Sequence, residues 1–242
     1  VVAQLTVLAL ILTPIFTINA PTIVLPYAAL MGGFAAREVA VSTCHEYPRL
    51  FAHVVLSLFL GGGAGFAVCA TLVLTPTPWW DAQVMLPVCG MLFGNALSAL
   101  ALGVERLLCA LADGGTAELQ TILACGGSGW ESSLPSTRAA MRTGLTPTLN
   151  AMSAMGLVSI PGMMTGSVLS GTPPMLAARY QMVIMFLISF SSTVALTAAL
   201  LLARRAVFDV DQHRLRPGRI RAKSTGAGRT DVLAAAAAAA AA

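Results

Sequence analysis

Five long stretches of the chain contain no Asp, Glu, Lys or Arg. They cover residues 1–36, 50–80, 82–104, 143–178 and 180–203. The hydrocarbon core of a bilayer is about 30 Å thick, so a helix of about 20 apolar residues can cross it. Each stretch is long enough to do so. The composition agrees, because 57% of the residues are hydrophobic and 10% are charged, against roughly 25% charged in soluble domains. Most soluble folds are therefore excluded.

Two of these stretches are too long for one crossing. Asn19-Ala20-Pro21 interrupts the first stretch, which we interpret as two helices joined by a tight turn. Gly171-Thr172-Pro173-Pro174 ends the fourth stretch and is typical of a loop. The sequence predicts an all-α membrane protein, a polytopic helical bundle within residues 1–205. Its six spans are expected at about 1–18, 22–42, 52–74, 83–105, 145–170 and 180–203.

The basic residues lie almost entirely on one side of this six-span topology. Thirteen of the 14 Lys and Arg fall on the side of the chain ends, and only Arg179 falls on the other. Because positive residues near span ends stay in the cytoplasm, the long loop 106–144 is predicted to be cytoplasmic. Residues 206–242 are then a basic cytoplasmic tail that ends in nine alanines, and we expect it to be disordered. The start at Val1, inside an apolar stretch, is interpreted as truncated.

The fifth predicted span contains a helix break. Pro161 has no N–H to donate to the carbonyl of Leu157, and Gly162 relaxes the backbone further. Irregular backbone persists in a membrane only where protein buries it or where it lines a wet cavity. We therefore predict a transport path here, with Pro161 and Gly162 as its hinge. Four methionines surround the break and are predicted to line the path: Met152, Met155, Met163 and Met164.

Thioether sulfurs suit a soft metal ion such as copper(I), so Met163 and Met164 are candidate metal ligands. Alternatively, the four methionines fill gaps in the core. Asn95 and Asn150 are the most polar side chains within the spans. Each either faces the path or hydrogen-bonds a neighbouring helix.

No Asp, Glu, Lys or Arg lies deep in any predicted span, which argues against a carrier coupled to an ion gradient. The only lysine, Lys223, follows Ala222, so the sequence has no G-x-x-x-x-G-K-[ST] phosphate loop. Energy for uphill transport must then come from a partner. No catalytic residue is predicted, because His45, His53 and His213 have no carboxylate or nucleophile at a spacing that suggests catalysis. The five cysteines likewise lack the spacing of a zinc site.

The segment from Thr116 to Cys125 is expected to form a short amphipathic helix in the cytoplasmic loop. Leu119, Ile122 and Leu123 lie on its apolar face, Glu118 lies elsewhere, and Gly126 follows its end. Such a helix is either an ordinary surface helix or a coupling helix that sits in a groove of an ATPase. Separately, Gly pairs four residues apart on three spans predict tight helix packing: Gly61 and Gly65, Gly90 and Gly94, Gly162 and Gly166.

Three segments resemble the membrane subunits of FetB-type ABC transporters: MLPVCGMLFGNA at 85–96, MGLVSIPGMMTG at 155–166 and AARYQM at 177–182. That family includes the bacterial iron-export permease and the plant aluminium-tolerance half-transporters. The resemblance runs from about Gln4 to Leu215. It implies one further amino-terminal span and assigns Glu118 to Gly126 to the coupling region. Asn150 and Ser153 depart from the acidic and basic residues expected there.

The resemblance implies a multi-pass permease, not an enzyme, in a plasma or organelle membrane. Two copies would pair with two cytoplasmic ABC ATPase subunits, which bind ATP and magnesium, while this chain holds no cofactor and binds no nucleic acid. The expected substrate is an exported metal ion, iron first. The alternatives are a nucleotide-independent channel or membrane scaffold, and an ABC permease for a non-metal substrate such as a sugar nucleotide.

Overall fold

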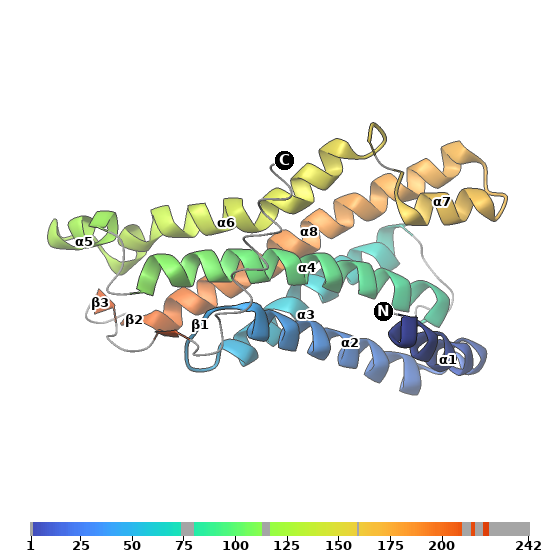
Figure 1. Ribbon diagram of the computed structural model, residues 1–242, viewed down its shortest axis with the longest axis horizontal. Helices are drawn as coiled ribbons and strands as arrows, with labels where there is room; N and C mark the ends of the chain where they lie inside the picture. Colours follow the sequence, from blue (N-terminus) through green and yellow to red (C-terminus); the bar gives the residue numbers. More distant parts are fainter. Residues whose placement is uncertain are drawn as a thin grey trace.

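A computed structural model describes residues 2–73, 80–112, 117–158, 160–209, 214–215 and 220–222. These residues are mainly helical, as predicted, and form an elongated bundle (Figure 1). The helices are α1 (Val2–Ile18), α2 (Pro21–Ser42), α3 (Leu50–Val68), α4 (Ala82–Leu111), α5 (Ala117–Ala124), α6 (Gly129–Ala154), α7 (Gly162–Leu169) and α8 (Pro174–Val207). One π-helical turn, Cys69–Val73, continues α3. Two antiparallel pairs of short strands complete the fold: β1 (His45–Glu46) with β4 (Arg221–Ala222), and β2 (Phe208–Asp209) with β3 (Arg214–Leu215).

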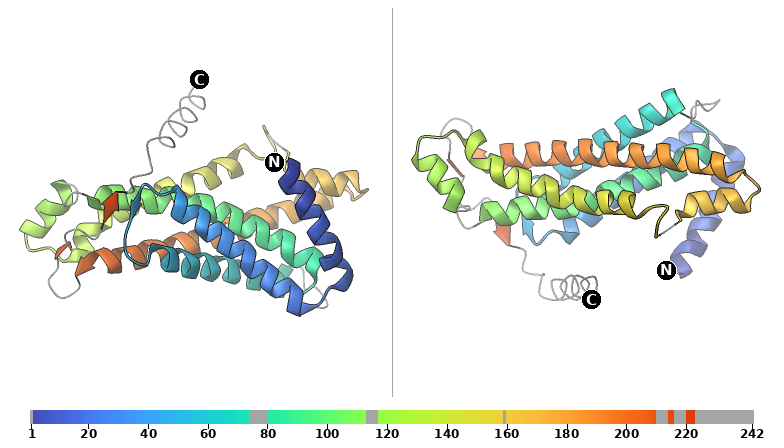
Figure 2. Two further views of the ribbon diagram at one scale, coloured as in Figure 1. Left: turned by 60° about the horizontal axis from the view of Figure 1, so that its bottom comes forward. Right: turned by 90° about the horizontal axis from the view of Figure 1, so that it is seen from above.

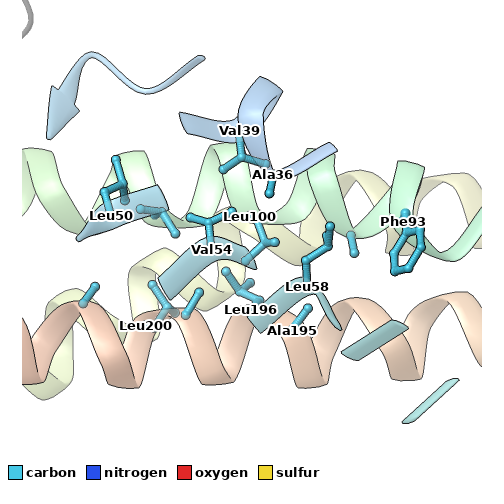
Figure 3. Close-up of a cluster of buried hydrophobic side chains, with 14 of the residues drawn as sticks. Ala36, Val39, Leu50, Val54, Leu58, Phe93, Leu100, Ala195, Leu196 and Leu200 are labelled. Atoms are coloured by element: carbon cyan, nitrogen blue, oxygen red, sulfur yellow. The ribbon is translucent and has the colours of Figure 1, made fainter. Parts of the chain in front are cut away.

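The core lies where α3, α4 and α8 pack together. Val54 and Leu58 from α3, Leu100 from α4, and Leu196 and Leu200 from α8 are almost fully buried there (Figure 3). Glycines allow the backbones to approach closely. A Cβ on Gly61 would lie 2.5 Å from the Ser191 carbonyl oxygen of α8. A Cβ on Gly144 of α6 would lie 2.7 Å from the Ala99 carbonyl oxygen of α4.

The two ends of the bundle differ in their connections. One end holds α5, the start of α6 and the ends of α4 and α8 (Figure 1). We call it the basic end, because Arg106 lies near the end of α4 and Arg204 and Arg205 lie in the last turn of α8. At the other end Asn19, between α1 and α2, donates a hydrogen bond to the Asp81 carboxylate (3.3 Å) and accepts one from the Ala82 N–H (2.9 Å). The turn between α1 and α2 is thus in contact with the start of α4.

Among the residues that the structure describes, four helices are long and apolar enough to cross a membrane: α2, α3 with its continuation to Thr71, α4 and α8. The chain is therefore an all-α membrane protein, whereas the count of six spans is not confirmed. The apolar part of α1, Leu8–Ile18, is shorter than a span. The fifth predicted span is divided between α6 and α7, which the right-hand view of Figure 2 places one after the other along α8.

The predicted loop 106–144 is helical over most of its length. The structure continues α4 to Leu111 and begins α6 at Gly129, because a capping box holds its first turn. The Ser128 side chain accepts a hydrogen bond from the Glu131 N–H, and the Glu131 carboxylate accepts one from the Ser128 N–H. Small residues on α6, including Ser133 and Ala140, are then buried against the bundle. Within the predicted tail 206–242, only 206–209, 214–215 and 220–222 belong to the described residues.

Candidate functional site

The predicted helix break is present, and it begins before Pro161. Helix α6 ends at Ala154, and Gly156 follows its C-cap Met155 with a φ of 80°, in the left-handed region that favours glycine. The Val158 N–H donates a hydrogen bond to the Ala154 carbonyl oxygen (2.9 Å). Pro161 then caps the start of α7 in an extended conformation. The sequence predicted the break at its proline, and the structure adds a glycine stop at Gly156, five residues earlier in the chain.

A cavity of about 510 Å³ lies beside this break. Its walls come from the end of α6, the break, α7 and the first half of α8. The residues that line it are Met152, Met155, Gly156, Ile160, Pro161, Met164, Ala178, Gln181, Met182, Met185 and Phe186. We call this space the methionine cavity, because five of the lining residues are methionines. Its volume is typical of ligand sites, which span roughly 300–1,000 Å³.

Gln181 supplies the polar group in this lining. The residue is 7% exposed, and its Nε2 lies 4.0 Å from the Met155 sulfur, as a donor to it. Its Oε1 is buried without a hydrogen-bond partner among the described residues. An unpaired buried polar atom costs about 1–3 kcal/mol. Gln181 therefore brings a buried amide to a lining that is otherwise mainly apolar and rich in methionine.

Only some of the predicted path residues line this cavity. Met152, Met155 and Met164 do so, together with the predicted hinge residue Pro161. The other hinge residue, Gly162, is the first residue of α7. Met163 is 37% exposed and lies outside the lining. Both asparagines also lie outside it: Asn150 is exposed on α6, and the Asn95 side chain donates to the Met91 carbonyl oxygen (2.9 Å). The transport roles of these residues remain predictions.

The lining residues on α8 were missing from the sequence prediction. Gln181, Met182, Met185 and Phe186 lie within a predicted span, and none of them is among the predicted path residues. A signal was present, since Gln181 is the one amide between residues 180 and 203. Residues four positions apart share a helix face, so Gln181 and Met185 would have indicated a lining surface.

The predicted coupling segment forms α5 at the basic end (Figure 1). Leu119 is 1% exposed and belongs to the main core, while Ile122 and Leu123 are half-buried. These residues hold α5 against its own chain. Glu118 is exposed, and so is Gly126, whose φ of 84° reverses the chain after the helix. The surface that α5 offers to a partner is therefore its polar side. Its contact with an ATPase stays a prediction.

Sequence comparisons identify the chain's relatives. A family model described as uncharacterised protein family UPF0014 matches residues 1–208. A UPF0014 membrane protein of Synechocystis sp. is 33% identical over 88% of this chain and 82% of its own length. The probable iron export permease protein FetB of Escherichia coli is 26% identical over 88% of this chain and 80% of its own length.

A plant relative extends the comparison. The protein ALUMINUM SENSITIVE 3 of Arabidopsis thaliana is 28% identical over 79% of this chain and 68% of its own length. No solved structure matches the chain. Multi-pass membrane localisation follows from the membrane-protein relatives together with the four long apolar helices. The name of the Escherichia coli relative agrees with a transport component. The match over residues 1–208 shows that this chain is a member of the UPF0014 family of membrane proteins.

Proposed function

We propose that this chain is the membrane-spanning subunit of an ABC transporter that exports a metal ion, with iron as the first candidate. The observation that carries the proposal is the methionine cavity beside the interrupted helix. One relative is named a probable iron export permease, which agrees in substrate class. ATP would be hydrolysed by a separate cytoplasmic subunit, and a second copy of this chain would complete the path.

The geometry suggests how a movement of the ATPase subunit is transmitted to the wall of the methionine cavity. Helix α6 has 26 residues, which corresponds to about 39 Å at roughly 1.5 Å per residue. Its capped start lies at the basic end beside α5, and its other end is part of the cavity wall. Movement of α5 and the start of α6 by the ATPase would therefore displace Met152 and Met155 relative to α8. The break lets α7 respond separately, which is the requirement for alternating access.

The lining also bears on the substrate. Among the described residues that line the cavity, none is charged. A sugar nucleotide carries phosphates that proteins usually bind through Arg, Lys or clustered N–H groups. The lining argues against that alternative. Thioethers favour soft ions, copper(I) above all, so copper belongs beside iron among the ions to be measured.

Metal accumulation in cells tests the proposal. Cells would express this chain alone, its ATPase partner alone, both together, or both with a catalytically inactive ATPase. Cellular iron, copper, zinc and manganese would be measured by mass spectrometry after metal loading. We expect a fall in iron or copper only when the chain and the active ATPase are both present. Unchanged contents for every metal would contradict the proposal, and a fall without the ATPase would favour the channel.

A further inference from the structure

Three metal-ligand side chains converge at the basic end, away from the methionine cavity. His45 Nδ1 lies 3.0 Å from Glu105 Oε1. The Cys109 sulfur lies 3.1 Å from the same oxygen and 3.6 Å from His45 Nδ1. Glu105 and Cys109 are one turn apart on α4, whereas His45 comes from β1. Folding thus brings the His45 nitrogen to an oxygen and a sulfur that one turn of α4 already holds together.

The surrounding backbone fixes this triad. Glu105 Oε2 accepts hydrogen bonds from the Cys44 N–H (2.8 Å) and the His45 N–H (3.4 Å). The other carboxylate oxygen is thereby directed to the His45 and Cys109 side chains. His45 is also held by strand pairing, because it lies opposite Ala222 of β4. Outer contacts of this kind orient the ligands of metal sites.

The distances within the triad approach those around a metal ion. Zinc binds nitrogen and oxygen at about 2.0–2.2 Å and sulfur at about 2.3 Å. Tetrahedral geometry then separates its ligand atoms by roughly 3.4–3.6 Å. The three ligand atoms of the triad are 3.0, 3.1 and 3.6 Å apart. An ion would fit after the side chains spread by about half an ångström or less.

Water can reach this position. The side chains of His45 and Glu105 are 22% and 24% exposed, and Cys109 is exposed. Three protein ligands leave one tetrahedral position for water or a fourth ligand, as in zinc sites that stay open. The combination of imidazole, carboxylate and thiolate suits borderline divalent ions and is too soft for magnesium or calcium.

We propose that His45, Glu105 and Cys109 form a binding site for a divalent transition metal ion such as zinc(II), iron(II) or cobalt(II). The bound ion would tie the connection between α2 and α3 to α4, and through β4 to the carboxyl-terminal segment. The site uses none of the residues of the methionine cavity. It therefore stands independently of whether the chain transports a metal.

Cobalt(II) is the probe, because a thiolate ligand gives it a charge-transfer absorption and tetrahedral coordination gives it intense visible bands. The full chain, purified in detergent under reducing conditions, would be titrated with cobalt(II) and then with zinc(II). We expect one equivalent of cobalt to produce both absorptions and zinc to remove them. The absence of a thiolate band in the unaltered chain would overturn the proposal.

Four variants locate the site. Cys109→Ala should lose the thiolate band, and Glu105→Gln, which preserves the side-chain shape, should weaken cobalt binding at least tenfold. Cys125→Ala is the matched control, because Cys125 is also an exposed free cysteine but lies after α5. It should retain the band, as should Met155→Leu in the methionine cavity. A band that survives Cys109→Ala, or one that disappears in Cys125→Ala, would contradict the assignment.

Discussion

Two glycine pairs with the same four-residue spacing have opposite surroundings. On α3, a Cβ added to Gly61 would lie 2.5 Å from a backbone oxygen of α8, and one on Gly65 would lie 3.0 Å from the Ser191 Cβ. On α7, a Cβ on Gly162 or Gly166 would meet no atom of the other described residues within 4 Å. The spacing that locks two helices together in one region leaves a helix unpacked in the other.

This difference divides the bundle into a tightly packed part and an open part. In the packed part, the Leu196 side chain of α8 lies against Gly103 of α4 and Gly144 of α6. In the open part, α7 has no buried residue among those described, and Leu157 and Val158 in the break are 88% and 86% exposed. Close-packed interiors resist small displacements, whereas sparsely packed segments move at low cost. A moving element is therefore expected at the break.

The largest difference is expected between Gly61→Ala and Gly166→Ala. Gly61→Ala forces apart two backbones, so it should lower the free energy of unfolding by about 1–3 kcal/mol. Gly166→Ala meets open space inside a helix, so it should leave the free energy of unfolding unchanged or raise it by up to about 1 kcal/mol. Unfolding of the purified protein in detergent, followed by circular dichroism, measures both. Equal losses of stability would remove the distinction between the two parts.

A second test addresses movement at the break. Replacing Pro161 with Ala restores an N–H and permits a continuous helix, so the hinge should stiffen. We expect metal efflux to fall at least tenfold, about 1.4 kcal/mol in activation free energy, while membrane insertion is unchanged. Pro26→Ala in α2 is the control, because that proline lies within an uninterrupted helix. Normal metal efflux in Pro161→Ala would contradict the role of Pro161 as a hinge.

A smaller effect is expected at the basic end, where α6 and α8 are joined by one stacked pair. The Arg204 guanidinium carbon lies 3.3 Å from the centre of the Trp130 ring. Arg204 is 7% exposed and Trp130 is 54% exposed. We expect a coupling energy of about 0.5–1 kcal/mol. A double-mutant cycle with Trp130→Leu and Arg204→Lys measures it. Strictly additive effects would show that the pair does not link the helices.

The smallest effect concerns pH at the start of α6. Hydrogen bonds from the Ser128 N–H and hydroxyl hold the pKa of Glu131 below its usual value. A carboxyl with a lowered pKa stabilises the folded state above its unfolded pKa, here about 4.3. That contribution disappears as the pH falls through the lower folded value. Hydrogen exchange in the first turn of α6 should therefore accelerate on acidification. In Glu131→Gln that pH dependence should vanish, and its persistence would implicate another group.

The fold class and the break were predictable because both follow from local rules. Charge-free length predicts membrane helices, and Pro161 predicts an interruption. The extent of α6 was not predictable. The charge-free stretch begins only after Arg138 and Arg142, whereas the Ser128 cap starts the helix well before these two residues. The packing role of each glycine pair was also hidden. Spacing gives the face of a helix, and only the tertiary arrangement decides whether a partner covers that face.

Candidate site residues were predictable where they lie close together in the sequence, and not where tertiary packing brings them together. Met152, Met155 and Met164 lie close to Pro161 in the sequence, so the break drew attention to them. The residues of α8 that line the same cavity reach it only because the chain folds back after α7. His45 and Glu105 are 60 positions apart in the chain. Their contact comes from long-range packing, so no spacing rule could indicate it.

The most direct test of the transport account is metal efflux by the combined variant Met152→Leu, Met155→Leu and Met164→Leu. Leucine nearly preserves side-chain volume and removes the sulfur, so the fold and the cavity should remain. With the active ATPase present, efflux of the transported metal should fall at least tenfold relative to the unaltered chain. Met163→Leu, outside the lining, should leave it unchanged. Full efflux by the combined variant would contradict the methionine cavity as the metal's path.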